Sequence, residues 1–215
     1  MRRPWRRERL VNWKLIRAIV FDLGKVLIPF EWQRGYDAFA AASQYPAEEV
    51  RARLKETGLF DGFERGKVES RELAERVSEV LGLSVGFDEF QKLWSSIFLP
   101  ETIVPEQMLE RLRRNHRLLL LSNTDAIHFR WVKGRYPSLR HFDDFVLSFE
   151  LGLRKPDPGI YQETISRAGC EAREIFFTDD RQDNVEGAIQ AGIDAVQFLS
   201  VEQLAQELRA RGVEW

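Results

Sequence analysis

The amino-acid sequence predicts an α/β protein in which a doubly wound parallel sheet carries an inserted helical segment. Two observations predict the sheet: short apolar runs recur along the chain and end in small polar or acidic residues, and helical patterns alternate with them. A third observation predicts the insertion. About 95 residues separate the first apolar run from the second, which is far more than one crossover connection needs.

Five apolar runs are the predicted strands. Parallel strands are buried on both faces of their sheet, so they read as continuous apolar runs and not as an alternation of apolar and polar residues. The carboxyl ends of parallel strands meet at one edge of a sheet, and we therefore expect the polar residues that end these runs to share one crevice. The predicted strands are residues 17–21, 118–121, 145–147, 175–177 and 195–199.

The segments between the runs have the signals of helices. Pro105 and Pro158 each stand where a helix begins, and Gly169 stands where the second of these helices ends. In the long interval, Ser70 is a candidate N-cap and Gly82 a candidate C-cap. The predicted core helices are residues 105–114, 158–169, 184–192 and 202–212, and those of the long interval are residues 46–58, 70–82 and 87–98.

These elements predict three parts of the chain. Residues 1–16 are a basic tail, residues 17–30 with 100–215 form the core domain, and residues 31–99 form a helical domain inserted into it. The tail lacks the apolar stretch that an export signal needs. We expect a loosely docked or disordered terminus, and an RNA or phospholipid contact is a less favoured alternative.

Composition excludes several classes of function. The chain has 215 residues, of which 44% are hydrophobic and 31% charged, the balance of a water-soluble globular protein. Seven of the 32 basic residues lie in residues 1–17, so the rest of the chain is acidic and gives no support for a nucleic-acid partner. A single cysteine, Cys170, and the lack of a bilayer-long apolar run predict a cytoplasmic protein without a membrane partner. Three scattered histidines exclude a His/Cys zinc site.

Asp22 is the first residue with chemical significance. It directly follows the first predicted strand, where a buried sheet would hold its backbone while the side chain faces the crevice. Such an aspartate is placed to act as a nucleophile or a metal ligand. Taken alone, it fits a loop entry or a helix cap as well.

A second acidic group ends another predicted strand. Asp179, Asp180 and Asp183 put three carboxylates within five residues, and Asn184 follows them. Carboxylates this dense repel one another unless a cation lies between them, and oxygen ligands favour magnesium. The alternative is an exposed acidic turn that caps the next helix.

Three further residues suit a phosphate group. Ser122 and Asn123 end the leucine-rich strand and offer a hydroxyl and a backbone N–H, and Lys155 offers a compact positive charge. Each of these signals is weak alone. Together with a carboxylate nucleophile and a magnesium ion, they are what an enzyme needs to attack a phosphate and form an aspartyl phosphate.

Four stretches of the sequence carry a family resemblance. FDLGKVLI, LLLLSNT, ELGLRKPDPGIY and FFTDDRQDNVEGA resemble, in order and spacing, the four motifs of the haloacid dehalogenase superfamily; they occupy residues 21–28, 118–124, 150–161 and 176–188. The resemblance spans about residues 17–200. The chain is similar to members of subfamily IA, in which residues 31–99 would be a C1-type cap domain. Its motifs are most similar to those of the branch that contains a bacterial glucose-1-phosphate phosphatase.

The resemblance implies a role for each matching residue. Asp22 is the implied nucleophile, Lys155 the implied catalytic and phosphate-binding lysine, and Ser122 and Asn123 bind phosphate. The implied magnesium ligands are Asp22, Asp179, Asp180 and the carbonyl of Gly24. In the cap, Glu64 and Arg65 are placed to reach over the phosphate toward the rest of the substrate.

Gly24 is a departure from the family pattern. Most phosphatases of the superfamily have a second aspartate at this position, which serves as general acid and base. Loss of general acid–base catalysis typically costs ~10²–10⁴ in rate, so the leaving group must be a good one or another group must supply the proton. The candidates are Lys25, Glu64, His128 and a metal-bound water, and the sequence leaves all four open.

We therefore expect a magnesium-dependent phosphatase that acts on a small phosphorylated metabolite, a sugar phosphate being the favoured class. Two alternatives stay open. Gly24 favours a catalytically idle module that binds a phosphorylated ligand or a protein. A metal-free haloacid dehalogenase also lacks the second aspartate, but Asp179 and Asp180 argue against it, because a site without a metal has no reason to gather carboxylates around an anionic substrate.

Overall fold

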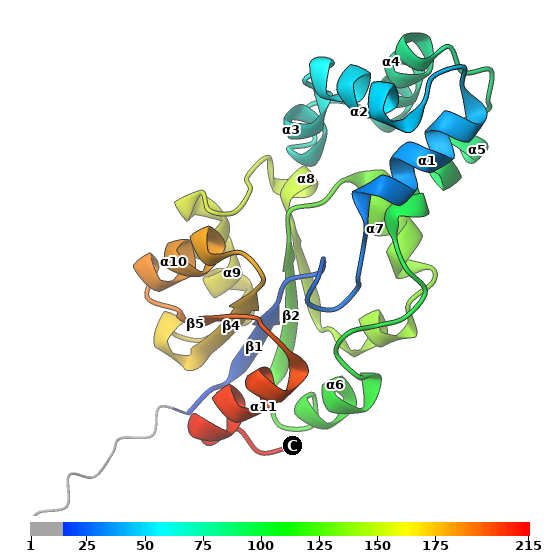
Figure 1. Ribbon diagram of the computed structural model, residues 1–215. Coiled ribbons are helices and arrows are strands. Elements are labelled where there is room, and N and C mark those ends of the chain that lie inside the picture. The colour runs from blue at the N-terminus through cyan, green and yellow to red at the C-terminus, as the bar shows by residue number, and fades with distance from the viewer. Residues whose placement is uncertain (1–14) are drawn as a thin grey trace, which may run out of the picture.

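The computed structural model describes residues 15–215, and residues 1–14 of the predicted tail lie outside the described residues. Five strands form one sheet in the order β3–β2–β1–β4–β5, and every neighbouring pair is parallel (Figure 1). The sheet confirms the predicted fold class. The strands are β1 (Ala18–Phe21), β2 (Arg117–Ser122), β3 (Asp144–Leu147), β4 (Ile175–Asp179) and β5 (Asp194–Gln197).

Helices cover both faces of the sheet, which makes it doubly wound (Figure 1). Successive side chains of a strand point to opposite faces, so each face has its own apolar core. Ile19 and Phe21 of β1 pack with α6 and α11, whereas Ala18 and Val20 pack with α9 and α10. The core helices are α6 (Glu106–Leu112), α7 (Ala126–Lys133), α8 (Ser148–Leu151), α9 (Pro158–Ala168), α10 (Gln182–Gln190) and α11 (Val201–Ala210), with 3-10 turns at Pro137–His141 and Ala172–Glu174.

Of the six α-helices between β1 and β2, the first five lie beyond one end of the sheet (Figure 1). They enclose an apolar cluster of their own, to which Phe39, Phe90 and Trp94 contribute, and Ile127 of α7 joins it from the core. We call this segment the helical insert. Its helices are α1 (Trp32–Ala42), α2 (Ala47–Glu56), α3 (Leu59–Glu64), α4 (Ser70–Leu81) and α5 (Phe87–Trp94).

The last helix of the insert is shorter than predicted. The sequence pattern predicts a helix over 87–98, but α5 ends at Trp94 and a 3-10 turn covers Ser95–Ile97. Phe98 leaves the helix because the returning chain pairs with the outgoing one: Phe30 and Phe98 form an antiparallel bridge, and the N–H of Leu99 donates to the Pro29 carbonyl at 3.0 Å. The two connections between the sheet and the insert are therefore bonded side by side.

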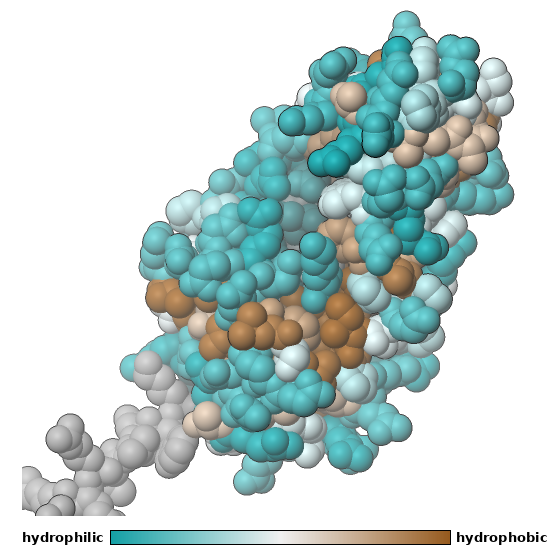
Figure 2. Space-filling model, in the orientation of Figure 1, coloured by the Kyte–Doolittle hydropathy of each residue, from teal (hydrophilic) through white to brown (hydrophobic). Residues whose placement is uncertain are grey.

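The surface seen in Figure 2 is mainly hydrophilic over the insert, and hydrophobic residues gather on the part of this face that belongs to the core. Four large hydrophobic residues are exposed among the described residues: Leu15, Trp32, Ile189 and Leu199. None of the helices in residues 15–215 has the length and apolar character that crossing a membrane requires.

Candidate active site

Asp22 lies at the carboxyl end of the central strand. Its N–H donates to the Thr178 carbonyl at 3.0 Å, which extends the pairing of β1 with β4 by one residue and fixes the backbone. The residue is buried, with 8% of its surface exposed. The sheet therefore presents the Asp22 carboxylate from a rigid backbone, as the sequence predicts.

Lys155 joins the ends of three strands. Its Nζ donates to Asp22 Oδ1 at 2.5 Å, to Asp179 Oδ2 at 2.6 Å and to the Leu121 carbonyl at 2.9 Å. Its backbone is fixed by a reciprocal pair of bonds with Asn123, in which Lys155 N–H donates to Oδ1 at 2.8 Å and Nδ2 donates to the Lys155 carbonyl at 2.9 Å. Burial lowers the pKa of Lys155, but Asp179 and Asp22 outweigh that effect and the net pKa is raised. The lysine is therefore a fixed positive charge.

Three carboxylates meet beside this lysine. One oxygen each of Asp22, Asp179 and Asp180 lie within 4.8 Å of one another. Burial raises the pKa of Asp22 to about 7; Lys155 opposes this rise and Asp179 adds to it. The pKa of Asp180 is also raised, first by burial and then by Asp179. The cluster holds more negative charge than Lys155 balances, which is the condition under which oxygen ligands hold a divalent cation.

Neighbouring groups orient Asp179. Asn184 Nδ2 donates to both of its oxygens, at 2.9 and 3.1 Å, and the N–H of Arg181 donates to Oδ1 at 2.9 Å. Asp183, the third carboxylate of the sequence cluster, turns away and pairs with the Arg181 guanidinium at 2.6 Å. Asp179 therefore belongs to the buried carboxylate cluster, whereas Asp183 belongs to an exposed acidic turn at the start of α10.

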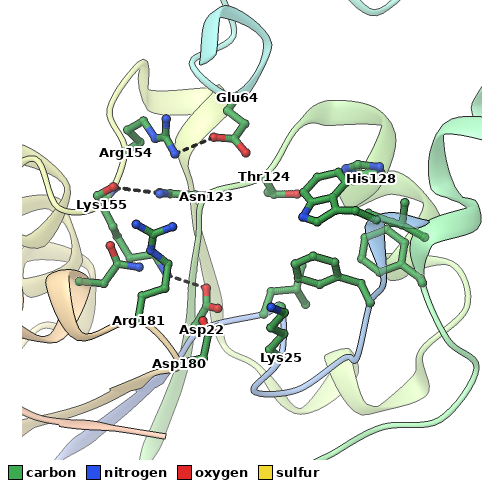
Figure 3. A pocket seen from close by; sticks show the side chains of 17 residues that line it. Asp22, Lys25, Glu64, Asn123, Thr124, His128, Arg154, Lys155, Asp180 and Arg181 are labelled. Carbon is green, nitrogen blue, oxygen red and sulfur yellow. Dashed lines mark hydrogen bonds and ion pairs between the residues drawn. The ribbon is translucent and has the colours of Figure 1, made fainter. Parts of the chain in front are cut away.

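A pocket of about 280 Å³ opens above these groups (Figure 3). Glu64 of α3 reaches its upper rim, where it pairs with Arg154 of the core at 3.0 Å. Burial raises the pKa of Glu64, and the opposing charge of Arg154 offsets only part of that rise. The wall between the rim and the carboxylates is largely aromatic, and it is formed by Phe30, Trp32, Ile97, Phe98 and His128.

The structure brings most of the predicted site residues together. Asp22, Gly24, Asn123, Lys155, Asp180 and Glu64 all line the pocket, and Asp179 lies beneath it. Ser122 is buried at the end of β2, and its neighbours Asn123 and Thr124 supply the lining there. Arg65 does not reach the pocket. Its guanidinium lies 2.7 Å from Asp157 of the core and 3.3 Å from Asp61 of α3.

Sequence reasoning missed several lining residues. Arg154 directly precedes Lys155 within a recognised motif, so a signal for it existed in the sequence. Thr124 and Arg181 also lie within recognised motifs, beside Asn123 and Asp180, whereas Phe30 had no comparable signal. Trp32, the first residue of α1, is 43% exposed and lines the pocket.

The arrangement defines what chemistry the pocket can perform. A carboxylate oxygen of Asp22 faces an open space that is bordered by a lysine ammonium, by the ends of the strands and by a second pair of carboxylates. This combination places a nucleophile beside positive charge and beside a candidate site for a hard cation. It suits nucleophilic attack on an anionic group with several oxygens.

Comparisons with known proteins agree with this geometry. Residues 16–192 match the family model of the haloacid dehalogenase-like hydrolases. A D-ribitol-5-phosphate phosphatase of Bacteroides thetaiotaomicron is 25% identical over 90% of this chain and 97% of its own length, and a Mycobacterium tuberculosis phosphatase is 30% identical over 84% and 86%. A crystal structure of a Bacteroides thetaiotaomicron enzyme of the same family, in complex with magnesium and inorganic phosphate, superposes with a TM-score of 0.76 at 28% identity and covers 86% of this chain and 95% of that one.

Proposed function

The chain belongs to the haloacid dehalogenase-like hydrolases, and from this premise we propose that it is a magnesium-dependent phosphatase of a small phosphorylated metabolite. The convergence of Asp22, Lys155, Asp179 and Asp180 at the ends of parallel strands carries the proposal. The two relatives described above, which this chain matches over most of their length, are phosphatases and support it.

Asp22 is the proposed nucleophile. One of its oxygens forms a bond to phosphorus while the bond between phosphorus and the substrate oxygen breaks, which gives an aspartyl phosphate and the dephosphorylated product. A water molecule then attacks this phosphorus, releases inorganic phosphate and restores the carboxylate. Lys155 holds Asp22 in position at 2.5 Å and offsets the charge that builds up on the phosphoryl oxygens.

The residues present fit a magnesium ion. Asp22, Asp179 and Asp180 offer only oxygen ligands, and the pKa values of Asp22 and Asp180 are raised by burial and by the charge of Asp179. Together with the carbonyl of Gly24, they are the proposed ligands. A bound magnesium ion would cancel the repulsion between these carboxylates and a phosphate dianion.

The phosphate is proposed to lie between Lys155 and the end of β2, where Asn123 and the hydroxyl of Ser122 border the same edge of the sheet. We propose that residues 31–99 act as a cap over this edge and select the substrate. Glu64 is the cap residue whose carboxylate reaches the pocket, and it is the proposed contact for substrate hydroxyl groups. A sugar or polyol phosphate is therefore the favoured substrate class.

A substrate panel tests this proposal. Phosphorylated sugars, acyl phosphates and p-nitrophenyl phosphate are incubated with wild type and with Asp22→Asn, with and without magnesium. We expect turnover that needs magnesium and is lost in Asp22→Asn. Absence of turnover on the whole panel, with inorganic phosphate still bound, would instead support an idle phosphate-binding module.

A further inference from the structure

The chain has no acidic side chain at position 24, where the family resemblance implies the general acid that protonates the leaving oxygen. Gly24 stands two residues after Asp22, and a Cβ built on Gly24 would lie 2.6 Å from Cε1 of Phe30. The Phe30 ring therefore fills the space that a longer side chain at position 24 would occupy. A different group must stabilise the oxygen that departs from phosphorus.

The next residue has an unusual backbone. Lys25 has a φ of 58°, in the left-handed region, and it is the only residue other than glycine with positive φ in residues 15–215. The loop that imposes this conformation is well bonded: Lys25 N–H donates to the Ile28 carbonyl at 2.8 Å, and Ile28 N–H donates to the Leu23 carbonyl at 2.9 Å. Glycine would adopt this backbone without strain, so a lysine here indicates that its side chain has a use.

That side chain ends in the pocket. Lys25 lines the pocket with its ammonium 5.4 Å from the centre of the Phe30 ring, which is the ring that fills the space beside Gly24. Figure 3 shows Lys25 on one side of Asp22, with Lys155 and Arg181 on the other. Lys25 therefore places a positive charge on the side of Asp22 opposite to Lys155.

Lys25 also differs from the other cations of the pocket in having no partner. Within residues 15–215, its Nζ has no hydrogen bond or ion pair to another side chain or to the backbone, whereas every other cationic or histidine side chain of the lining has a carboxylate partner. Arg154 pairs with Asp61 and Glu64, Lys155 with Asp22 and Asp179, Arg181 with Asp183, and His128 with Asp125. The unpaired ammonium is available to a substrate.

The other two side chains that the sequence offered for this task are engaged elsewhere. His128 has Nδ1 at 2.8 Å from Asp125 and Nε2 at 2.9 Å from the Trp94 carbonyl, so neither ring nitrogen faces the pocket freely. Glu64 is held by Arg154 at the rim. Lys25 is the candidate that the structure leaves free to act.

We propose that Lys25 is a catalytic residue whose ammonium donates a hydrogen bond to the leaving oxygen as its bond to phosphorus breaks. This inference rests on the proposed phosphatase function. The electron pair of the broken bond stays on the departing oxygen, which takes a proton from water, and the resulting hydroxide is consumed when the aspartyl phosphate is hydrolysed. The positive charge of Lys25 stabilises the negative charge that develops on that oxygen.

Leaving-group dependence tests the inference. Phenyl phosphate releases a basic oxygen that needs stabilisation, whereas p-nitrophenyl phosphate releases one that spreads its charge into the nitro group. Loss of one donor to a developing oxyanion typically costs ~10²-fold in rate, so we expect Lys25→Met to lower kcat for phenyl phosphate by about that factor. The rate with p-nitrophenyl phosphate should fall far less, and Lys25→Arg should retain most of both activities.

Two further variants separate catalysis from structure. Lys133→Met is the matched control, because Lys133 also places its ammonium over phenylalanine rings, 5.8 Å from Phe129 and 5.1 Å from Phe145, but away from the pocket. It should leave both rates unchanged. Lys25→Gly removes the ammonium and the backbone strain together, so it should unfold at a higher urea concentration than wild type while losing activity on phenyl phosphate.

The outcomes are distinct. Equal losses on both substrates in Lys25→Met, or no loss on either, would overturn the role of Lys25 while leaving the phosphatase proposal intact. A Lys25→Gly variant that is less stable than wild type would show that the lysine serves the fold. A wild type that hydrolyses neither substrate would overturn the phosphatase proposal itself, and this inference with it.

Discussion

Lys155 is the residue on which the geometry of the site depends most. It is 2% exposed and lies between two buried carboxylates, so its removal would leave Asp22 and Asp179 facing each other without a positive charge. Breaking a buried ion pair by removing one partner typically costs ~3–5 kcal/mol, and we expect Lys155→Met to lower the free energy of unfolding by about that amount. Urea denaturation measures it.

Lys92→Met is the matched control for this prediction. Lys92 is exposed and pairs with Glu89 on the surface of α5, where an ion pair is worth at most ~1 kcal/mol. Combining Lys155→Met with Asp22→Asn should recover part of the lost stability, because Asp22→Asn removes one of the two buried carboxylates that Lys155→Met leaves without a positive partner. Equal stability losses in Lys155→Met and Lys92→Met would contradict this account of the buried network.

Gly24 lies too close to Phe30 to accept a larger side chain without a cost in stability. Gly24→Asp must displace the Phe30 ring, and overpacking of this kind typically costs ~1–3 kcal/mol. We expect the cost to shrink when Phe30→Leu provides room. A double-mutant cycle in urea measures the difference, and an identical cost in both backgrounds would show that the ring does not occupy the space in question.

Individual residues were predictable where a strand fixes them. Asp22 and Asp179 belong to strand ends, so their meeting follows from the parallel sheet, and the structure confirms that they lie together. The sequence predicts that Arg65 reaches the pocket, but Arg154 lines it instead, and this difference was not predictable. Both arginines reach across the boundary between insert and core, and the direction of such long side chains depends on how the two parts pack.

Among the elements, α7 links the pocket to the insert through a buried charged pair. Asp125 caps the helix by accepting from the N–H of His128 at 2.8 Å, and its second oxygen lies 2.8 Å from His128 Nδ1. Burial lowers the pKa of His128, but Asp125, the Trp94 carbonyl and Glu64 of α3 together outweigh it, so the net pKa lies above 6.5. The folded protein therefore binds this proton more tightly than the unfolded chain does.

The raised pKa of His128 makes the stability of the fold depend on pH. The stabilisation from a raised histidine pKa is complete below the unfolded value of 6.5 and is lost as pH rises through the folded pKa. The stability difference between wild type and His128→Gln should therefore be largest below pH 6.5 and should shrink at higher pH. Urea denaturation across this pH range measures it.

His116 provides the control. Burial lowers its pKa, so its contribution is present above pH 6.5 and is lost as pH falls, and His116→Gln should show the opposite trend. Parallel pH trends for the two variants would contradict the assignment of the His128 and Asp125 pair.

The helices that the sequence did not predict have physical reasons for being missed. The α7 segment contains Ile127, Phe129 and Val132, residue types that favour strands, and only its cap at Asp125 indicates a helix. The α1 segment begins without a side-chain cap and contains Gly35, where a Cβ atom would lie only 2.7 Å from Cγ2 of Ile97. Tertiary packing, and not local propensity, decides both helices.

Three ion pairs join the insert to the core beside the pocket. Arg154 of the core lies 2.8 Å from Asp61 and 3.0 Å from Glu64, and Arg65 of the insert lies 2.7 Å from Asp157. Asp61 and Asp157 have lowered pKa values, because each accepts hydrogen bonds from an arginine. These pairs place α3 over the open side of the pocket.

Such partly exposed ion pairs contribute little to the free energy of unfolding, but they hold the helical insert against the core. We expect Arg65→Met to change the free energy of unfolding by at most ~1 kcal/mol while raising KM more than it lowers kcat. Added salt should also raise the KM of the wild type, as Arg65→Met does, because salt screens exposed ion pairs. Arg76→Met, which removes a pair with Glu72 inside α4, should leave KM unchanged.

The overall architecture was predictable because its signals are repetitive. Five continuous apolar runs that alternate with helical patterns are typical of a parallel sheet covered on both faces, and the structure confirms this sheet. The division at residues 31–99 remains a prediction. The orientation of the insert depends on the two connections that pair at Phe30 and Phe98. No periodic pattern in the sequence predicts this pairing.

The central claim is that Asp22 accepts the phosphoryl group, and a probe that needs no substrate tests it most directly. Beryllofluoride with magnesium mimics a phosphoryl group on a carboxylate, and fluorine NMR detects the bound form. We predict bound resonances in the wild type that require magnesium and are absent in Asp22→Asn, with Asp183→Asn as a control that retains them, because Asp183 pairs with Arg181 outside the cluster. Equal resonances in wild type and Asp22→Asn would contradict the account.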